Sequence, residues 1–334
     1  MTALERRQVP IYFTAVLLGS AIGLLLPDSA SALESLIWPV VGALLYFTFL
    51  QVPLLQFRQA LADVRFLAAI LTANFMFVPV VVWLLLMVLP PSPPIQLGVA
   101  LVLLTPCTDW MNTFTLLGKG DAHRTLAATP LLLITQILLV PLFLWLLLES
   151  DASRMGATRP FLQAFFGLIV LPLSLAWLTE WCGKHNQRVA RAIARSSALP
   201  VVLLAVTVLV IAASQIQQVL DGARQLTLVT QVFVAYMALA AVVGRLTVWL
   251  YSLPPREGRG VIFSTGTRNS FVVLPLALAL PTEWHPAVAV IVIQAFVEML
   301  GMLVFIRLVP GWLLRDGAVG DSILNPADTG DGTN

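Results

Sequence analysis

The stretch LLLITQILLVPLFLWLLL, residues 131–148, decides the fold class of this chain. Only Thr135, Gln136 and Pro141 interrupt its apolar residues. A helix that crosses the hydrocarbon core of a bilayer needs roughly 20 mainly apolar residues, whereas the strands of a membrane β-barrel alternate apolar and polar side chains. The stretch therefore predicts a membrane-spanning helix.

The composition extends this prediction to the whole chain. Of 334 residues, 59% are hydrophobic and 11% are charged, and the mean hydropathy is +0.91. Soluble domains carry roughly 25% charged residues. The net charge is only +2, and the basic residues lie in short loops between apolar runs rather than on one continuous face. Nucleic-acid binding is therefore not expected. The first apolar stretch, residues 9–26, lacks a small-residue cleavage site before Pro27, and we interpret it as a membrane helix rather than a signal peptide.

Further apolar runs, separated by Pro, Gly or charge, predict an all-α polytopic membrane protein with ten transmembrane helices. The predicted spans are 9–26, 33–52, 66–90, 94–118, 125–149, 160–182, 196–220, 225–252, 260–281 and 285–308.

Basic residues in the loops between these spans indicate the orientation. Three, Arg154, Arg159 and Arg224, fall on one side of the membrane. Fourteen fall on the other: Arg6, Arg7, Arg58, Arg65, Lys119, Arg124, Lys184, Arg188, Arg191, Arg195, Arg256, Arg259, Arg307 and Arg315. By the positive-inside rule, this pattern predicts a cytoplasmic (inner) membrane protein with both termini in the cytoplasm.

Ten spans divide into two sets of five, and an odd number of spans forces the second set to run with opposite topology. The sequence thus predicts two inverted repeats, residues 1–150 and 151–316, followed by a disordered cytoplasmic tail at 317–334. The fourth span of each half holds hydroxyl and amide side chains. These clusters are LLTPCTDWMNTF at 103–114 and IFSTGTRNSFVVLP at 262–275.

The two clusters predict broken helices four and nine, whose half-helix ends face a central solute site. Because the same disturbance occurs in both halves, we favour this interpretation over its alternative. In that alternative, Ser and Thr bond back to helix carbonyls, and Pro106 and Gly266 only kink two ordinary helices.

Three ionisable residues lie inside predicted spans: Asp109, Arg268 and Glu298. A charge at the bilayer centre costs roughly 2.5–3.5 kcal/mol on insertion scales, so each needs a partner or a wet cavity. Asp109 and Arg268 occupy the two breaks, and we expect them to pair or to lie within one water of each other. They either serve the solute or form a buried ion pair that only pins the helices. A carboxyl group in apolar surroundings favours its neutral form, which makes Glu298 a candidate proton carrier.

Cys107 follows Pro106 in the first break. A lone membrane cysteine can be a small buried apolar residue, but inside a candidate site its thiolate suits soft, thiophilic species. Cys182 stands at the end of a span, apart from either break. His123, His185 and His285 have no metal-ligand spacing, and no nucleotide loop or nucleophile motif occurs. We therefore predict no enzyme, catalytic residue, metal site or cofactor.

These residues resemble the bile acid/sodium symporter superfamily, and within it the arsenite-efflux carriers of the arsenical-resistance branch. The resemblance covers nearly the whole chain. It rests on Pro106-Cys107-Thr108, Lys119-Gly120-Asp121, Gly266, Asn269 and Val297-Glu298. It implies that Cys107 engages trivalent arsenic and that Glu298 takes part in proton exchange.

The bile acid branch resembles this chain at Asn112 and at the Asn269-Ser270 pair. Its sodium sites also use an acidic residue and a glutamine in span nine, where this chain has Ser264 and Arg268. Because arginine brings a permanent positive charge, it would repel a bound cation and could substitute for it. The resemblance therefore gives no support for sodium coupling.

Three hypotheses follow. In the first, the chain exports arsenite by proton antiport, with Glu298 as proton carrier and a site formed by Cys107, Thr108, Asp109, Asn112, Arg268, Asn269 and Ser270. In the second, Arg268 and the half-helix N-termini hold an organic anion. In the third, the chain is a membrane sensor or scaffold that transports nothing. The first two require a small-molecule or metalloid substrate, and all three require a lipid bilayer.

Overall fold

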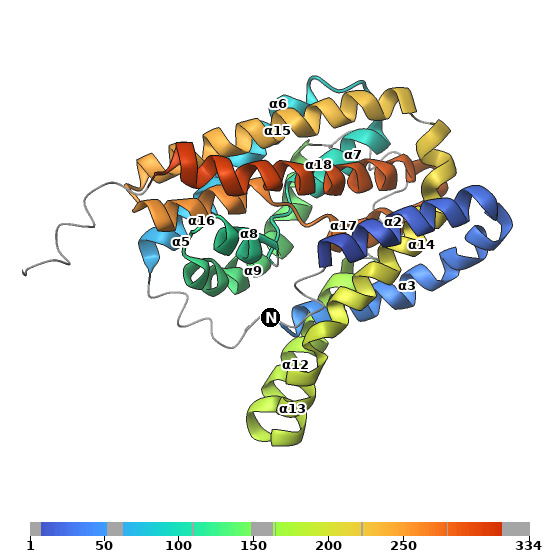
Figure 1. Ribbon diagram of the computed structural model, residues 1–334, viewed down its shortest axis with the longest axis horizontal. Helices are drawn as coiled ribbons and strands as arrows, with labels where there is room; N and C mark the ends of the chain where they lie inside the picture. Colours follow the sequence, from blue (N-terminus) through green and yellow to red (C-terminus); the bar gives the residue numbers. More distant parts are fainter. Residues whose placement is uncertain are drawn as a thin grey trace, which may run out of the picture.

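A computed structural model describes residues 8–51, 63–108, 110–147, 163, 165–221, 223–278 and 280–315. Within these residues, the regular elements are all helices (Figure 1). They are α2 (Gln8–Leu25), α3 (Pro27–Phe49), α5 (Val64–Thr72), η2 (Ala73–Phe77), α6 (Val78–Leu86), α7 (Pro93–Leu103), α8 (Trp110–Leu117), α9 (Ala122–Leu147), η3 (Phe165–Val170), α12 (Leu171–His185), α13 (Gln187–Arg195), η4 (Ser196–Ala198), α14 (Leu199–Asp221), α15 (Ala223–Leu250), α16 (Pro255–Gly266), α17 (Ser270–Leu278), η5 (Thr282–Trp284), α18 (Pro286–Leu308) and η6 (Val309–Leu313).

Six helical segments of the described chain are long and apolar enough to cross a membrane: Val64–Leu86, Ala122–Leu144, Phe165–His185, Gln187–Ser214, Thr227–Leu250 and Pro286–Leu313. Pro10–Leu25, Pro39–Phe49 and Pro93–Leu103 are shorter apolar helices. The prediction of an all-helical polytopic membrane protein is therefore confirmed. The count of ten spans, the inverted repeat and the boundary near residue 150 stay predictions, and the tail at 317–334 lies outside the described residues.

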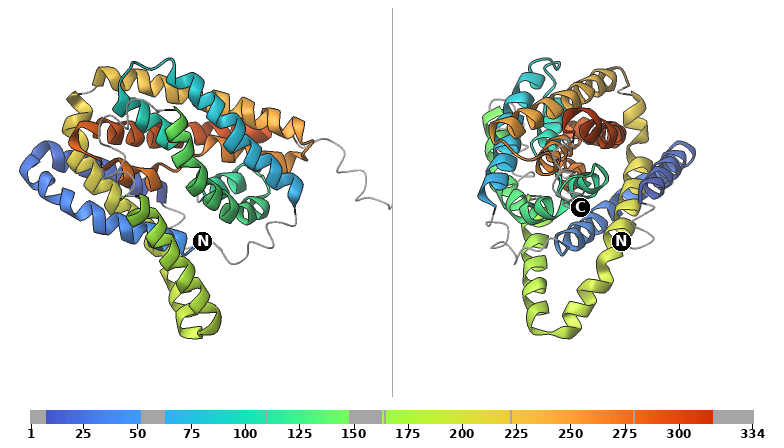
Figure 2. Two further views of the ribbon diagram at one scale, coloured as in Figure 1. Left: turned by 180° about the vertical axis from the view of Figure 1, so that it is seen from behind. Right: turned by 60° about the vertical axis from the view of Figure 1, so that its left-hand side comes forward.

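The helices pack in two groups (Figures 1 and 2). In the first group, α14 packs along α2 and α3, and α3 packs on α12. In the second group, α15 packs on α16 and α18, and α18 packs on α7. Large apolar side chains on the outer faces are exposed, including Leu17 (69%), Leu138 (68%) and Trp249 (69%). Such an exterior suits a hydrocarbon solvent rather than water.

Small residues let α2 and α14 approach closely. A Cβ atom added to Gly19 would meet the Leu209 carbonyl oxygen, and one added to Gly23 would meet the Ala213 carbonyl oxygen. Glycines four residues apart lie on one face of a helix, where they allow close contact between two backbones in a membrane.

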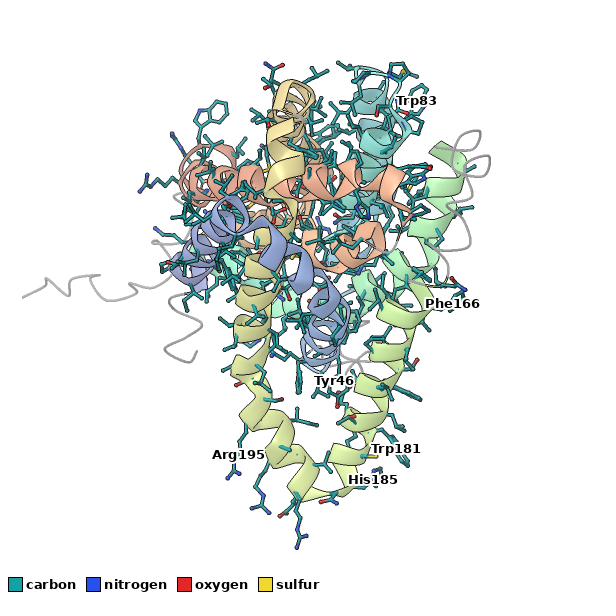
Figure 3. All side chains as sticks on the ribbon, turned by 90° about the vertical axis from the view of Figure 1, so that its right-hand side faces the viewer. Tyr46, Trp83, Phe166, Trp181, His185 and Arg195 are labelled. Atoms are coloured by element: carbon teal, nitrogen blue, oxygen red, sulfur yellow. The ribbon has the colours of Figure 1, made fainter. Side chains whose placement is uncertain are left out.

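The helix α13 is an element that the sequence interpretation missed, because residues 183–195 read as a basic loop between two spans. Asn186 begins it by accepting a hydrogen bond from the main-chain N–H of Arg188 (2.9 Å). Val189 and Ile193 are half-buried, whereas the three arginines of α13 are exposed. Figure 3 shows Trp181, His185 and Arg195 at the projecting end of the α12–α13–α14 hairpin.

The Lys119-Gly120-Asp121 run closes the turn before α9. One Asp121 carboxylate oxygen accepts hydrogen bonds from the main-chain N–H groups of His123 (3.1 Å) and Arg124 (3.2 Å), which caps the helix. The other oxygen pairs with the Arg124 side chain (3.1 Å). Arg124 also pairs with Asp63 and with Glu257 (3.1 Å), so this corner ties α5, α9 and α16 together.

Replacing Asp121 with alanine should lower the free energy of unfolding by about 1 kcal/mol, because the helix loses its cap. The matched variant Asp121→Asn keeps a capping oxygen but loses the charge, and it should lose less. Thermal unfolding of the detergent-solubilised protein measures both. Equal losses in the two variants would show that the ion pair, not the cap, stabilises this corner.

Candidate functional site

Two interrupted helices cross in the middle of the molecule. The first ends with α7 at Leu103 and restarts with α8 at Trp110, and the second ends with α16 at Gly266 and restarts with α17 at Ser270. The connecting segments pair as antiparallel extended chains, with Pro106 opposite Arg268.

Main-chain hydrogen bonds join the two connecting segments. The Asn269 N–H donates to the Thr105 carbonyl (2.8 Å), and the Cys107 N–H donates to the Thr267 carbonyl (3.3 Å). Each helix therefore ends and restarts after an extended segment. The alternative interpretation, in which two continuous helices are only kinked, does not describe this structure.

The residues in these segments explain why the helices stop. Pro106 has no N–H to continue a helix. The Thr105 hydroxyl donates to the Leu101 carbonyl (2.7 Å), and the Thr267 hydroxyl donates to the Phe263 carbonyl (2.9 Å). The Thr105 hydroxyl replaces the main-chain N–H of Thr105, which donates to the Val102 carbonyl instead (3.4 Å). The Thr267 hydroxyl adds a second hydrogen bond to the Phe263 carbonyl, which also accepts the Thr267 N–H (3.0 Å).

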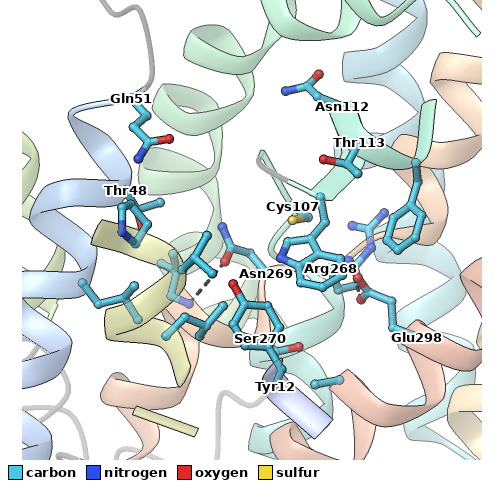
Figure 4. Close-up of a pocket in the computed structure, with 18 of the residues that line it drawn as sticks. Tyr12, Thr48, Gln51, Cys107, Asn112, Thr113, Arg268, Asn269, Ser270 and Glu298 are labelled. Carbon is cyan, nitrogen blue, oxygen red and sulfur yellow. Dashed lines mark hydrogen bonds between the residues drawn. The ribbon is translucent and has the colours of Figure 1, made fainter. Parts of the chain in front are cut away.

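A cavity of about 340 Å³ lies beside the crossing, between the two helix groups (Figure 4). Its polar lining residues come mainly from the interrupted helices, and its apolar wall comes from α2, α3 and α14. The residues that line it include Tyr12, Leu44, Gln51, Cys107, Trp110, Asn112, Ser197, Arg268, Asn269, Ser270 and Glu298.

Six of the predicted site residues line this cavity: Cys107, Asn112, Arg268, Asn269, Ser270 and Glu298. Thr108 is buried (2% exposed) outside the lining, and its carbonyl accepts a hydrogen bond from Asn112 Nδ2 (2.9 Å). Asp109 lies outside the described residues, and so does its predicted pairing with Arg268.

The guanidinium of Arg268 is buried among carbonyl oxygens. Its Nη2 donates to the carbonyls of Ser264 (3.0 Å) and Thr265 (2.6 Å), at the end of α16. Nη2 also donates to Asn74 Oδ1 (2.9 Å), and Nη1 donates to the Leu103 carbonyl (3.2 Å), at the end of α7. The positive charge thus lies where the C-terminal ends of two helices meet, which is where a helix dipole favours a cation.

Glu298 is anchored on the other side of the same segment. Its Oε2 accepts the main-chain N–H of Arg268 (2.8 Å) and the Gln294 side-chain amide (2.7 Å). The Ser270 hydroxyl is hydrogen-bonded to Gln294 Oε1. Ser270, Gln294 and Glu298 therefore form a polar chain that runs from the start of α17 along α18.

Among the described residues that line the cavity, three buried polar side-chain atoms have no hydrogen-bond partner: Asn112 Oδ1, Arg268 Nε and Asn269 Nδ2. A buried donor or acceptor without a partner costs about 1–3 kcal/mol, so such atoms are commonly satisfied by water or a ligand. These atoms are two donors and one acceptor, and all three belong to residues that line the cavity with Cys107.

The structure adds three residues that the sequence interpretation missed. Asn74 lies in the π-helix η2, and π-helical turns occur frequently at functional sites. The Tyr236 ring lies 5.6 Å from the Arg268 guanidinium carbon. Gln294 bonds Glu298. The sequence offered two signals for these residues. Asn74 is a lone amide in an apolar run, and Gln294 stands four residues before Glu298, on the same helix face.

Interrupted helices that meet beside a cavity, inside a bundle with an apolar exterior, define the class of membrane transporters for small solutes. Residues 38–222 match the Sodium Bile acid symporter family. Because this match covers more than half of the chain, the chain belongs to that family, whose members are transporters rather than enzymes. The match includes Cys107 and Asn112 and ends before α16. No curated protein matches the chain significantly.

Proposed function

We propose that this chain exports arsenite by proton antiport. The observation that carries the proposal is the position of Cys107, whose side chain lines the cavity at the crossing of the two interrupted helices. The unpaired atoms Asn269 Nδ2 and Asn112 Oδ1 lie in residues of the same lining. A thiol beside a hydrogen-bond donor and acceptor matches a small, thiophilic solute with hydroxyl groups.

The chemistry of binding is a ligand exchange at arsenic. Neutral As(OH)₃ accepts the Cys107 sulfur, an As–S bond forms and one As–OH bond breaks. The thiol proton leaves with the hydroxide as water, so arsenic stays trivalent and no electron is transferred. One thiol gives a weak and reversible bond, which suits a carrier that must release its solute.

The direction of transport follows from the charge pattern. The cavity extends from the crossing to Gln51 and Ser197, beside the basic helix α13. Basic loops face the cytoplasm by the positive-inside rule, so this end of the cavity receives solute from the cytoplasm. Glu298 lies at the other end of the cavity, next to the crossing, and is the carboxyl group that exchanges the proton.

An organic anion is the second candidate, because the cavity is larger than one arsenite molecule and has an apolar wall that includes Tyr12, Trp110 and Leu44. The contacts of Arg268 argue against a carboxylate held by two N–H groups of its guanidinium, because only Nε has no hydrogen-bond partner. Both Nη atoms of that group already bind buried carbonyl and amide oxygens. An organic solute would therefore bind through the wall and the amides.

The decisive test is arsenite accumulation in everted membrane vesicles, with and without an imposed proton gradient. We expect Cys107→Ser to lower gradient-driven accumulation by about tenfold or more, equivalent to roughly 1.4 kcal/mol of lost binding. Cys182→Ser is the matched control, because Cys182 lies on α12 outside the cavity. It should accumulate arsenite as the wild type does.

If neither the wild type nor the control accumulates arsenite, the metalloid proposal fails. Uptake of bile acids by the same vesicles, insensitive to Cys107→Ser, would then support the organic-anion candidate.

A further inference from the structure

Three main-chain carbonyls at the crossing have lost their helical partners. In a continuous helix, the Leu103, Ser264 and Thr265 carbonyls would accept the N–H groups of residues 107, 268 and 269. Those N–H groups instead donate to the Thr267 carbonyl, Glu298 Oε2 and the Thr105 carbonyl. The interruption thus leaves three acceptors turned toward one buried point.

The Arg268 guanidinium occupies that point. Nη1 donates to the Leu103 carbonyl, and the two N–H groups of Nη2 are shared among the Ser264 carbonyl, the Thr265 carbonyl and Asn74 Oδ1 from η2. The Tyr236 hydroxyl also donates to the Thr265 carbonyl (2.8 Å), and its ring lies beside the guanidinium. Oxygens that converge from three segments of the chain resemble the coordination shell of a hard cation.

The charges around this point favour a cation of single charge. Two helix C-termini contribute roughly half a negative charge each. In the described part of the chain, no salt bridge joins Arg268 to a carboxylate, and Glu298 contacts its main-chain N–H rather than its guanidinium. Among the residues that the structure describes, the direct contacts of the guanidinium are therefore oriented dipoles rather than carboxylates.

We propose that Arg268 is a tethered cation, which permanently fills a monovalent-cation position at the meeting point of α7 and α16 and makes the carrier independent of sodium. A free ion would leave this position when the solute leaves, whereas a covalently attached guanidinium stays. The inference concerns the coupling ion and does not rest on the identity of the solute.

Thermal unfolding of the purified protein tests this proposal without any transport assay. The wild type should unfold at the same Tm in sodium chloride and in N-methylglucamine chloride. Arg268→Gln should unfold at a lower Tm in N-methylglucamine, and sodium should raise that Tm saturably by about 2–4 °C. Arg268→Lys keeps a tethered charge and should not respond to sodium.

Two results would overturn the proposal. The first is a saturable sodium-dependent rise in the Tm of the wild type, a result that needs no variant. The second is an Arg268→Gln protein that folds and responds to sodium no more than the wild type does.

If Arg268→Gln does not fold, the variant Asn74→Ala replaces it. Removal of this one oxygen should lower Tm equally in sodium chloride and in N-methylglucamine chloride. A Tm that sodium restores would contradict a position already filled by Arg268. The failure of arsenite accumulation in vesicles would leave each of these outcomes unchanged.

Discussion

Replacing Glu298 with glutamine is expected to abolish proton-driven accumulation while leaving the fold intact. A glutamine carbonyl oxygen can accept the hydrogen bonds from Arg268 N–H and Gln294 that Glu298 Oε2 accepts in the wild type. The variant cannot take up and release a proton. We expect accumulation driven by a proton gradient to fall by about tenfold or more, with little change in Tm.

Exchange transport distinguishes lost coupling from lost binding. Vesicles preloaded with arsenite should still exchange it for external labelled arsenite in Glu298→Gln, because exchange needs no net proton movement. Glu283→Gln is the matched control, since Glu283 is exposed in η5. Gradient-driven accumulation at the wild-type rate in Glu298→Gln would exclude this residue as the proton carrier.

The second large effect is expected at the contact between α2 and α14. Gly23→Ala adds a Cβ atom that would overlap the Ala213 carbonyl oxygen and approach Ile216 Cγ2 to 2.6 Å. Backbone cannot move aside as a flexible side chain can, so the helices must separate. Overpacking costs about 1–3 kcal/mol and sometimes more. We expect a clear loss of Tm and a lower yield of folded protein.

Gly42→Ala is the matched control for this prediction. An added Cβ atom at Gly42, in α3, meets nothing within 4 Å. Alanine favours a helix by about 0.8–1.0 kcal/mol over glycine, so this variant should be as stable as the wild type or slightly more so. Equal Tm values for the two variants would show that α2 and α14 do not depend on close backbone contact.

The fold class was predictable because its signals are local. Long apolar runs identify membrane helices, and clusters such as 103–114 mark the positions where a helix stops. The helix α13 was not predictable in the same way. Its arginines suggest a loop between spans, whereas its helical structure depends on the half-buried Val189 and Ile193 and on the Asn186 cap.

The cavity is lined by six of the eight residues predicted for the site, but the hydrogen bonds among them were not predicted. Cys107, Asn269 and Glu298 were recognisable from their side chains, and the cavity brings them together. The environment of Arg268 was not recognisable, because its described partners are mainly main-chain oxygens. The sequence shows that Arg268 carries a charge, but it does not show which main-chain carbonyls the ends of α7 and α16 turn toward that charge.

At the crossing of the two interrupted helices, main-chain atoms join the two connecting segments, whereas side chains line the cavity. Two hydrogen bonds between the segments run from the Asn269 N–H to the Thr105 carbonyl and from the Cys107 N–H to the Thr267 carbonyl. Every residue has a main-chain carbonyl, and every residue except proline has a main-chain N–H. We therefore expect an exchange of the Cys107 side chain to leave these main-chain hydrogen bonds in place. If the cavity binds solute as proposed, a substitution at Cys107 would change its preference for a soft metalloid while the crossing itself stays intact.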